Sequence, residues 1–383
     1  MKYNKRFSIV IPSYQSKKQL SNTLEALNRQ IGISGDDFEV VVIDDGSTDG
    51  TGEVIKGIPK NYGFQYIYLE RTPGSSRSKA RNAGIMAAQG EIIVFLDADI
   101  IVKEDYISKV DDYFKVNRDI LLIGFRVMLT EEVTHEELSG TNALKGEKFK
   151  INKFGKLELR HFLFEGSSYN SRCNMYPWIH VFSCNMAVSK ELLDRSGFFD
   201  ENFKGWGMED VELGYRLYKC GAKIVISNKI EAFHQPHTPT GSSMSKEERD
   251  KEIDTNTIYF INKHPGAMDE PVPTILDFFR GAGVINFDVI REFEDVVAIN
   301  FTDKSELDSV KSEILKNSEI EKKVIMVLDF VEDTDLDIWI QLLDGVKSFP
   351  RYLPMSKGKE MAIIPDSPRL AFYREWEEKL RIE

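Results

Sequence analysis

The feature that most constrains the fold is a continuous apolar run that ends in two aspartates. Residues 91–96 read E-I-I-V-F-L, and Asp97, Ala98 and Asp99 follow directly. A short run of β-branched and large apolar side chains is typical of a strand buried on both faces of a parallel sheet. Open α/β sheets bind ligands at the carboxyl ends of their strands, where two such carboxylates can reach one divalent cation. For the pair alone, the alternative is a polar turn in which an aspartate caps the next helix.

Strand and helix patterns alternate on both sides of this run. The alternation predicts βαβ units, and therefore an α/β fold with a doubly wound, mostly parallel sheet and helices on both faces. We expect Gly90 to end the helix over residues 75–89 as a C-cap glycine. The predicted strands are residues 7–11, 38–43, 64–69, 91–96, 120–127, 181–188, 223–226 and 230–233, and the predicted helices begin at Ser16, Ser75, Glu104, Ser189 and Met208.

The chain of 383 residues is long enough for two domains. We predict a first domain over residues 1–270, in which residues 238–252 form a polar loop. Its irregular insert at residues 130–180 is rich in aromatics, which favours an acceptor-binding loop over the alternative of a disordered linker. Prolines at 265, 271 and 273 indicate a boundary, and a small α/β accessory domain follows over residues 275–383, with strands at 296–301, 323–330 and 361–364 and helices at 304–316 and 333–346.

Composition excludes some classes of partner. The net charge of −12 argues against an extended surface for nucleic acid, which normally needs a basic excess. The three cysteines are odd in number and widely spaced, so they indicate thiols in a reducing compartment and a cytoplasmic protein. No apolar run approaches the roughly 20 residues of a transmembrane helix. Peripheral membrane association and self-association stay open.

The acidic edge of the predicted sheet suggests a nucleotide site. It gathers carboxylates at several strand ends, and these can face a diphosphate only with a cation such as Mg²⁺ or Mn²⁺ between them. Asp45 could then accept a hydrogen bond from a base N–H, and Tyr14 could stack on the base. Arg77 or Arg81 could meet phosphate or the edge of uracil. A solvated helix face is the alternative for this basic cluster, and it is the favoured interpretation for Lys79. The residues expected at this edge are Pro12, Tyr14, Asp44, Asp45, Asp97 and Asp99.

Several motifs together resemble a known family. I-P-S-Y, V-I-D-D-G-S-T-D, R-S-K-A-R-N-A-G and F-L-D-A-D, at residues 11–14, 42–49, 77–84 and 95–99, resemble family 2 glycosyltransferases of the GT-A fold. G-W-G-M-E-D-V-E-L-G-Y-R-L and A-F-H-Q, at residues 205–217 and 232–235, are similar to the GalNAc or GlcNAc transferase domains of bacterial chondroitin and hyaluronan polymerases. Animal β-1,4-galactosyltransferases and polypeptide GalNAc-transferases share a related segment. The match covers about residues 7–240.

The resemblance implies roles for the nucleotide and metal residues. Asp45 would bind uracil, Asp99 would ligate the metal, and Asp97 would contact ribose or the metal. His234 would be a further ligand that suits Mn²⁺, since imidazole is softer than carboxylate. His237 is the competing ligand, and an ordinary strand-end histidine is the alternative for His234. The remaining nucleotide-binding residues would be Pro12, Tyr14, Arg77, Arg81 and Ala98.

The resemblance also implies the catalytic groups. Asp210 matches the general base, and Glu209 matches a residue that holds the donor or acceptor sugar. Trp206 and Gly207 would line the sugar site. Helix-dipole complementation for the two acids, and a core position for Trp206, are the alternatives. Met208 departs from the pattern, because these relatives usually have Gly there.

The implied activity is inverting, metal-dependent transfer of GalNAc, GlcNAc, Gal or Glc from a UDP-sugar to a hydroxyl of a glycan or polysaccharide. A protein or peptide side chain, including a cysteine thiol, is the alternative acceptor. A non-catalytic sugar-nucleotide-binding protein is a more distant alternative. A sugar nucleotidyltransferase would be expected to carry a Gly-rich, basic turn after its first strand, whereas this chain has P-S-Y-Q-S at residues 12–16.

Overall fold

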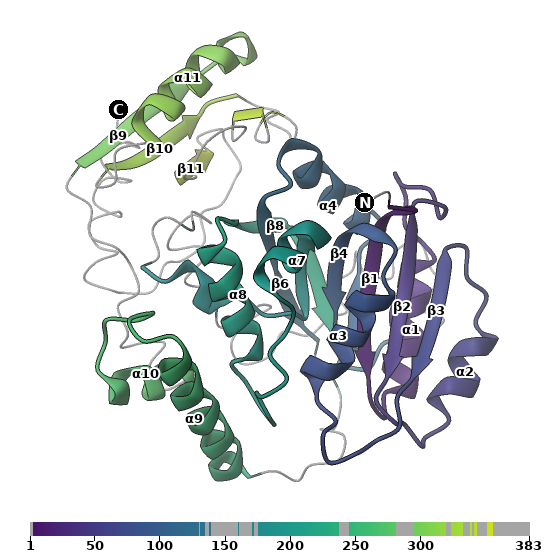
Figure 1. Ribbon diagram of the computed structural model, residues 1–383. Helices are drawn as coiled ribbons and strands as arrows, with labels where there is room; N and C mark the ends of the chain where they lie inside the picture. Colours follow the sequence, from purple (N-terminus) through teal and green to yellow (C-terminus); the bar gives the residue numbers. More distant parts are fainter. Residues whose placement is uncertain are drawn as a thin grey trace.

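The computed structural model describes residues 3–129, 131–134, 138, 160, 171, 175–236, 245–280, 295–318, 323–331, 338, 341–342 and 351–354. Two separate sheets organise these residues, one with eight strands and one with three (Figure 1). The larger sheet has the strand order β3-β2-β1-β4-β7-β6-β8-β5. Its strands are β1 (Lys5–Ser13), β2 (Phe38–Asp44), β3 (Gly63–Tyr68), β4 (Gly90–Leu96), β5 (Ile100–Val102), β6 (Ile120–Met128), β7 (Asn185–Ser189) and β8 (Lys223–His234).

Helices cover both faces of the larger sheet, because its strands are apolar on both faces. Within β1, Ile9 and Ile11 join one buried cluster and Val10 joins the other, and β2 and β4 alternate in the same way. One cluster is completed by α1 (Lys17–Leu27), α2 (Thr51–Gly57) and α4 (Tyr106–Val116). The other is completed by α3 (Arg77–Ala87), α7 (Lys190–Ser196), α8 (Glu209–Lys219), α9 (Lys246–Lys263) and α10 (Val272–Phe279).

The order β3-β2-β1-β4 produces a switch point between β1 and β4. The chain winds outward from β1 to β3 and then returns to the other side of β1, and all four strands are parallel. The parallel pairing of β1 with β2 continues to Ser13 and Asp44, but its pairing with β4 ends at Val10 and Phe95. The residues that follow β1 and β4 therefore diverge at the carboxyl edge, which is where doubly wound sheets bind ligands.

The predicted α/β class is confirmed, with local corrections. β7 runs antiparallel to β4 and β6, and β5 runs antiparallel to β8, so the sheet is mixed. The two strands predicted at residues 223–226 and 230–233 are one strand, β8, because a register shift between Ile123 and Phe125 of its partner β6 accommodates the intervening residues.

The prediction for Gly90 is wrong. Ala88 is the C-cap of α3, and Gly90 begins β4. A Cβ atom at Gly90 would lie 2.4 Å from the carbonyl carbon of Phe7 and the nitrogen of Ser8. The glycine is therefore explained by the close approach of two strands rather than by a helix end.

The predicted polar loop over residues 238–252 is also wrong in its second half. Helix α9 begins at Lys246, and Ser245 and Glu248 form a reciprocal capping box at its start. The sequence S-K-E-E is the signal for this helix. Ile253, Thr257 and Phe260 supply its buried face at helical spacing.

A buried carboxylate joins α9 to α8. Glu212 lies 2.8 Å from Nη2 of Arg216, 2.7 Å from Nζ of Lys263 and 2.9 Å from Nε2 of His264, and it is completely buried. Burial alone would raise the pKa of Glu212, but the hydrogen bonds from Arg216, Lys263 and His264 outweigh burial and hold the pKa below its ordinary value. The carboxylate therefore stays ionised and ties the two helices together.

The smaller sheet has the order β11-β10-β9 and is parallel throughout. Its elements are β9 (Asp295–Phe301), η3 (Lys304–Glu306), α11 (Leu307–Ser318), β10 (Lys323–Asp329) and β11 (Arg351–Pro354), with a separate small apolar cluster. Phe278 of α10 belongs to the core of the larger sheet. The division into domains 1–270 and 275–383 stays a prediction, and the predicted strand at residues 361–364, most of the predicted helix at 333–346 and most of the 130–180 insert lie outside the described residues.

In the part of the chain that the structure describes, no helix is both long enough and apolar enough to cross a membrane.

Replacing Glu212 by Gln should lower the free energy of unfolding by about 3 kcal/mol, because the partly exposed cations Arg216 and Lys263 lose the buried carboxylate that they share. Urea denaturation at pH 7 measures this. Because the folded pKa is depressed, the contribution of Glu212 is present above its unfolded pKa and is lost as the pH falls through the folded pKa. The difference between wild type and Glu212→Gln should therefore shrink in acid. Glu104→Gln, at an exposed position, should change stability by less than about 0.5 kcal/mol.

Candidate active site

At the end of β1 and β2, an arginine fills the expected base site. Nη1 of Arg71 lies 2.5 Å from Oδ2 of Asp45, and the Arg71 guanidinium lies 3.8 Å from the centroid of the Tyr14 ring. The other oxygen of Asp45 is buried and has no hydrogen-bond partner among the described residues. Tyr14 and Asp45 are thus brought together as expected, while Arg71 was not foreseen.

The loops around Tyr14 are held by the residue that follows it. Gln15 has a φ of 51°, and its side-chain carbonyl accepts hydrogen bonds from the backbone N–H groups of Thr48 and Asp49. Asp44 belongs to the same framework, because its carboxylate accepts from Ser47 N and Tyr66 Oη. Asp44 ends β2 and is buried, and its carboxylate is held by the loop and by Tyr66 of β3.

Arg81 is the centre of the acidic edge. Its Nη2 atom lies 3.2 Å from Oδ1 of Asp97, and its Nη1 atom lies 3.2 Å from Oε1 of Glu209 and 3.5 Å from Oδ1 of Asp210. The Arg81 side chain is only 3% exposed. Burial opposes its charge, but the attraction of Asp210, Asp97 and Glu209 outweighs burial and raises its pKa, so Arg81 stays a cation.

The surroundings of Asp210 make its carboxylate more basic than an ordinary one. Its carboxylate accepts hydrogen bonds from the backbone N–H and the hydroxyl of Ser183, at 3.0 and 2.8 Å. Burial and the neighbouring charge of Glu209 raise the pKa of Asp210 to about 6, against the lowering effects of Arg81 and Ser183. A carboxylate with a pKa in this range can accept a proton near neutral pH.

Asp99 and His234 meet at the next strand end. The pairing of β5 with β8 sets Ile100 opposite His234, and the backbone N–H of Gln235 donates to the carbonyl of Asp99. Oδ2 of Asp99 and Nε2 of His234 are 3.4 Å apart. Among the described residues, no group of three or more His, Cys, Asp or Glu side chains is arranged to hold a metal. His237 lies outside the described residues.

A strained loop carries Trp206. Met208 has a φ of 75°, a left-handed conformation that costs a residue with a Cβ atom about 1–2 kcal/mol. The conformation explains why glycine would suit this position, and the side chain of Met208 is buried. Trp206 is 47% exposed, and the guanidinium of Arg77 lies 4.7 Å from the centroid of its ring. Trp206 is therefore not a core residue.

The structure brings most of the predicted site residues together in three groups. Tyr14 joins Asp45, Asp99 joins His234, and Arg81 joins Asp97, Glu209 and Asp210. Ala98 is buried, and its carbonyl accepts a hydrogen bond from Thr23 Oγ1. Pro12 lies within β1, where pairing with β4 has already ended, and Gly207 lies beside Trp206 with a φ of 88°. The residues that sequence reasoning missed are Arg71, just beyond β3, and Ser183, just before β7.

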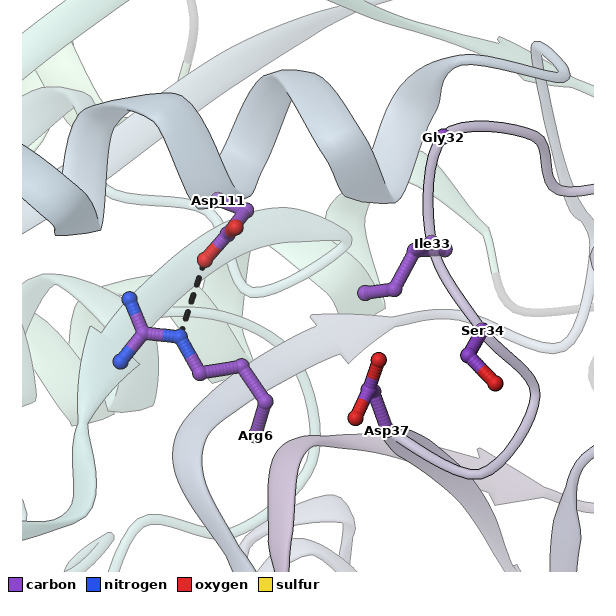
Figure 2. A pocket seen from close by; sticks show the side chains of 6 residues that line it. All are labelled: Arg6, Gly32, Ile33, Ser34, Asp37 and Asp111. Atoms are coloured by element: carbon purple, nitrogen blue, oxygen red, sulfur yellow. Dashed lines mark hydrogen bonds and ion pairs between the residues drawn. The ribbon is translucent and has the colours of Figure 1, made fainter.

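A pocket at the opposite edge of the sheet does not belong to this site. Figure 2 shows Arg6 and Asp111 pointing toward each other across it. The guanidinium of Arg6 lies 2.9 Å from Asp111 and 2.7 Å from Glu91, so its charge is balanced within the protein. The pocket lies near the amino end of β1, away from the acidic strand ends.

The fold and the arrangement of side chains define an α/β protein with acidic groups at the carboxyl edge of its sheet, the edge at which doubly wound sheets bind ligands. Residues 8–194 match the profile of glycosyl transferase family 2, and residues 166–238 match that of the N-terminal domain of galactosyltransferase. This part of the chain belongs to the glycosyltransferases, with family 2 over residues 8–194.

Three relatives illustrate the match. Validoxylamine A glucosyltransferase of Streptomyces hygroscopicus subsp. limoneus is 30% identical over 269 residues, which are 69% of this chain and 58% of that protein. Chondroitin synthase of Escherichia coli is 30% identical over 60% of this chain and 34% of its own. Hyaluronan synthase of Pasteurella multocida is 29% identical over 70% of this chain and 27% of its own. The chain thus spans less than two thirds of each relative.

Replacing Arg81 by Met should lower the free energy of unfolding by about 3–5 kcal/mol, because three carboxylates would lose the cation they share. Arg77→Met is the matched control, since Arg77 lies one helical turn earlier and is exposed, and it should cost less than about 1 kcal/mol. Chemical denaturation at pH 7 compares the two. Equal losses would contradict the central role of Arg81.

Proposed function

We propose that this chain is an inverting, metal-dependent glycosyltransferase that moves a hexosyl or N-acetylhexosaminyl group from a UDP-sugar to a hydroxyl of a glycan or polysaccharide. The observation that carries the proposal is the convergence of Asp97, Glu209 and Asp210 on the buried Arg81. It sets a carboxylate with a raised pKa beside the end of β4, the strand that the family resemblance assigns to nucleotide and metal. The names of two relatives, a chondroitin synthase and a hyaluronan synthase, agree with a polysaccharide acceptor, and the name of the third, a glucosyltransferase, agrees with transfer of a hexosyl group.

Uracil binding is supported by the contacts of Arg71. Its planar guanidinium donates to Asp45 and stacks on Tyr14, which are the two contacts that the proposal gives to the base. Uracil would donate its N3–H to Asp45 and stack on Tyr14 in its place. Arg71 therefore has to leave these partners when UDP binds, and because its side chain is 45% exposed it has room to move.

The residues at the end of β4 and β8 fit a divalent cation. The 3.4 Å between Asp99 and His234 is compatible with two ligands that each lie about 2.1 Å from one cation. One carboxylate and one imidazole favour Mn²⁺ over Mg²⁺. When bound, the cation would offset the charge of the diphosphate and stabilise the departing UDP. Asp97 stays beside Arg81, where it can reach ribose or the ion.

Transfer would proceed by in-line displacement. The acceptor oxygen attacks the anomeric carbon, the bond from that carbon to the UDP oxygen breaks, and UDP leaves with the electron pair. Asp210 takes the proton of the acceptor hydroxyl, while Ser183 fixes the direction of its carboxylate. Glu209 and Trp206 would contact the sugar.

Incubation with UDP-sugars and Mn²⁺ tests the function, with release of UDP and mass spectrometry of products as measurements. Turnover with glycan acceptors is the expected result. Transfer to peptides alone would identify the alternative acceptor. Binding without any UDP release would mean a sugar-nucleotide-binding protein and would contradict the proposal.

Asp210→Asn should lower transfer by about 10²–10⁴-fold while UDP binding by calorimetry stays nearly unchanged, because Asp210 acts on the acceptor and not on the nucleotide. Asp194→Asn, an exposed position on α7, should leave both quantities unchanged. Retained turnover in Asp210→Asn would contradict the assignment of Asp210 as the general base.

The pH profile should follow the raised pKa of Asp210. Because the base acts when it is deprotonated, kcat/KM should rise with pH through about 6. Glu209 raises this pKa by repulsion, so Glu209→Gln should move the acidic limb of the residual activity to lower pH. If the acidic limb of Glu209→Gln lay at the same pH as that of wild type, the limb would not report the titration of Asp210.

A further inference from the structure

The loop before α8 has a backbone that its own sequence does not favour. Gly205, Gly207 and Met208 have φ values of 70°, 88° and 75°. Two glycines tolerate this conformation without strain, but for Met208 it is strained, so the loop needs contacts from elsewhere to hold it. The loop matters because it carries Trp206 and leads directly into Glu209 and Asp210.

One side chain of α9 supplies such contacts. The amide nitrogen of Asn256 lies 2.8 Å from the carbonyl oxygen of Lys204, 3.1 Å from that of Trp206 and 2.9 Å from that of Gly207. Asn256 is 5% exposed. A carboxamide is suited to this task, because its two N–H groups can be shared among several carbonyls.

A second side chain of α9 holds the same loop from one helical turn earlier. Oε2 of Glu252 accepts a hydrogen bond of 2.9 Å from the backbone N–H of Trp206. A Cβ atom at Gly205 would lie 2.4 Å from the Glu252 carboxylate, so the glycine permits this close approach. On the other side, Arg77 of α3 covers the Trp206 ring. The backbone of Trp206 is thus held by α9, and its ring is held by α3.

We propose that Asn256 is a positioning residue for sugar transfer. It acts through the loop at residues 204–208, fixing Trp206 against the sugar and fixing the start of α8, from which Glu209 and Asp210 project. The inference rests on the proposed function, and it adds α9, which lies beyond the residues 8–238 that match the two family profiles. Asn256 itself contacts only protein carbonyls among the described residues.

The residues proposed to bind uracil are not among the contacts of Asn256, so the proposal predicts different effects on kcat and on UDP affinity. Tyr14 and Asp45 lie on the loops after β1 and β2, and among the described residues the side-chain hydrogen bonds of Asn256 go to the loop at residues 204–208 instead. A displacement of the reacting groups by about 1 Å can cost about 100-fold in rate. Loss of Asn256 should therefore reduce kcat much more than it weakens UDP binding.

The test compares Asn256→Leu, which keeps the volume but removes the amide, with Thr255→Ala, its exposed neighbour on α9. We expect Asn256→Leu to lower kcat at least tenfold, with UDP affinity by calorimetry within twofold of wild type. Hydrogen exchange of peptides that contain residues 203–209 should become faster, while exchange around Tyr14 stays the same. Thr255→Ala should behave as wild type in all three measurements. Asn256→Gln, which restores the donor, should recover part of the rate.

Glu252→Ala keeps the test decisive if Asn256→Leu does not fold, because Glu252 is only half-buried. It should give the same pattern with a smaller loss of kcat. The proposal would be overturned if the kcat of Asn256→Leu stayed within twofold of wild type, whether or not exchange of the loop increases. Where Asn256→Leu does not fold, the same limit applies to Glu252→Ala. If the wild-type protein shows no transfer, the proposed function fails, and hydrogen exchange still decides whether Asn256 holds the loop.

Discussion

The site depends on one buried cation. Arg81 contacts Asp97, at the end of β4, and also Glu209 and Asp210, at the start of α8, although Glu209 follows Arg81 by 128 positions in the chain. Three carboxylates so close together would repel one another in a buried site, and the guanidinium makes their convergence stable. Arg81 lowers the pKa of Asp210, but burial and the charge of Glu209 outweigh this effect, so the pKa of Asp210 stays raised. Arg81 is therefore both a structural link and an electrostatic control on the proposed base.

The sheet explains why these groups can meet. β1 and β4 separate at the switch point, and α3 brings Arg81 across the same edge. Two antiparallel strands bring further groups to this edge. Ser183 precedes β7 and contacts Asp210, and the pairing of β5 with β8 sets Ile100, which follows Asp99, opposite His234. Helix α9 stabilises α8 and the loop that precedes it. Its attachment to α8 through Glu212 and its contacts with the loop at residues 204–208 connect the core to the proposed sugar site.

Local sequence patterns predict much of this arrangement. The apolar strands, the acids at their ends and the fold class follow from periodicity, and the family resemblance named Asp97, Asp99, Glu209, Asp210 and His234. The contacts of Arg71 and Asn256 were not predictable in this way, because each depends on which segments lie side by side in three dimensions. Gly90 was misjudged because a glycine at a helix end and a glycine between close strands look alike in sequence. The capping box at Ser245 was readable, but the polar residues around it favoured a loop.

We infer that the carboxyl edge and the start of α8 form one site for a metal-bound UDP-sugar. A crystal structure with UDP and Mn²⁺, with anomalous data at the manganese edge, tests it most directly. We expect a manganese peak bound by Asp99 and His234, uracil stacked on Tyr14 after Arg71 has moved, and Asp210 open to the space beside the diphosphate. Manganese or UDP bound away from the ends of β1 and β4 would contradict it.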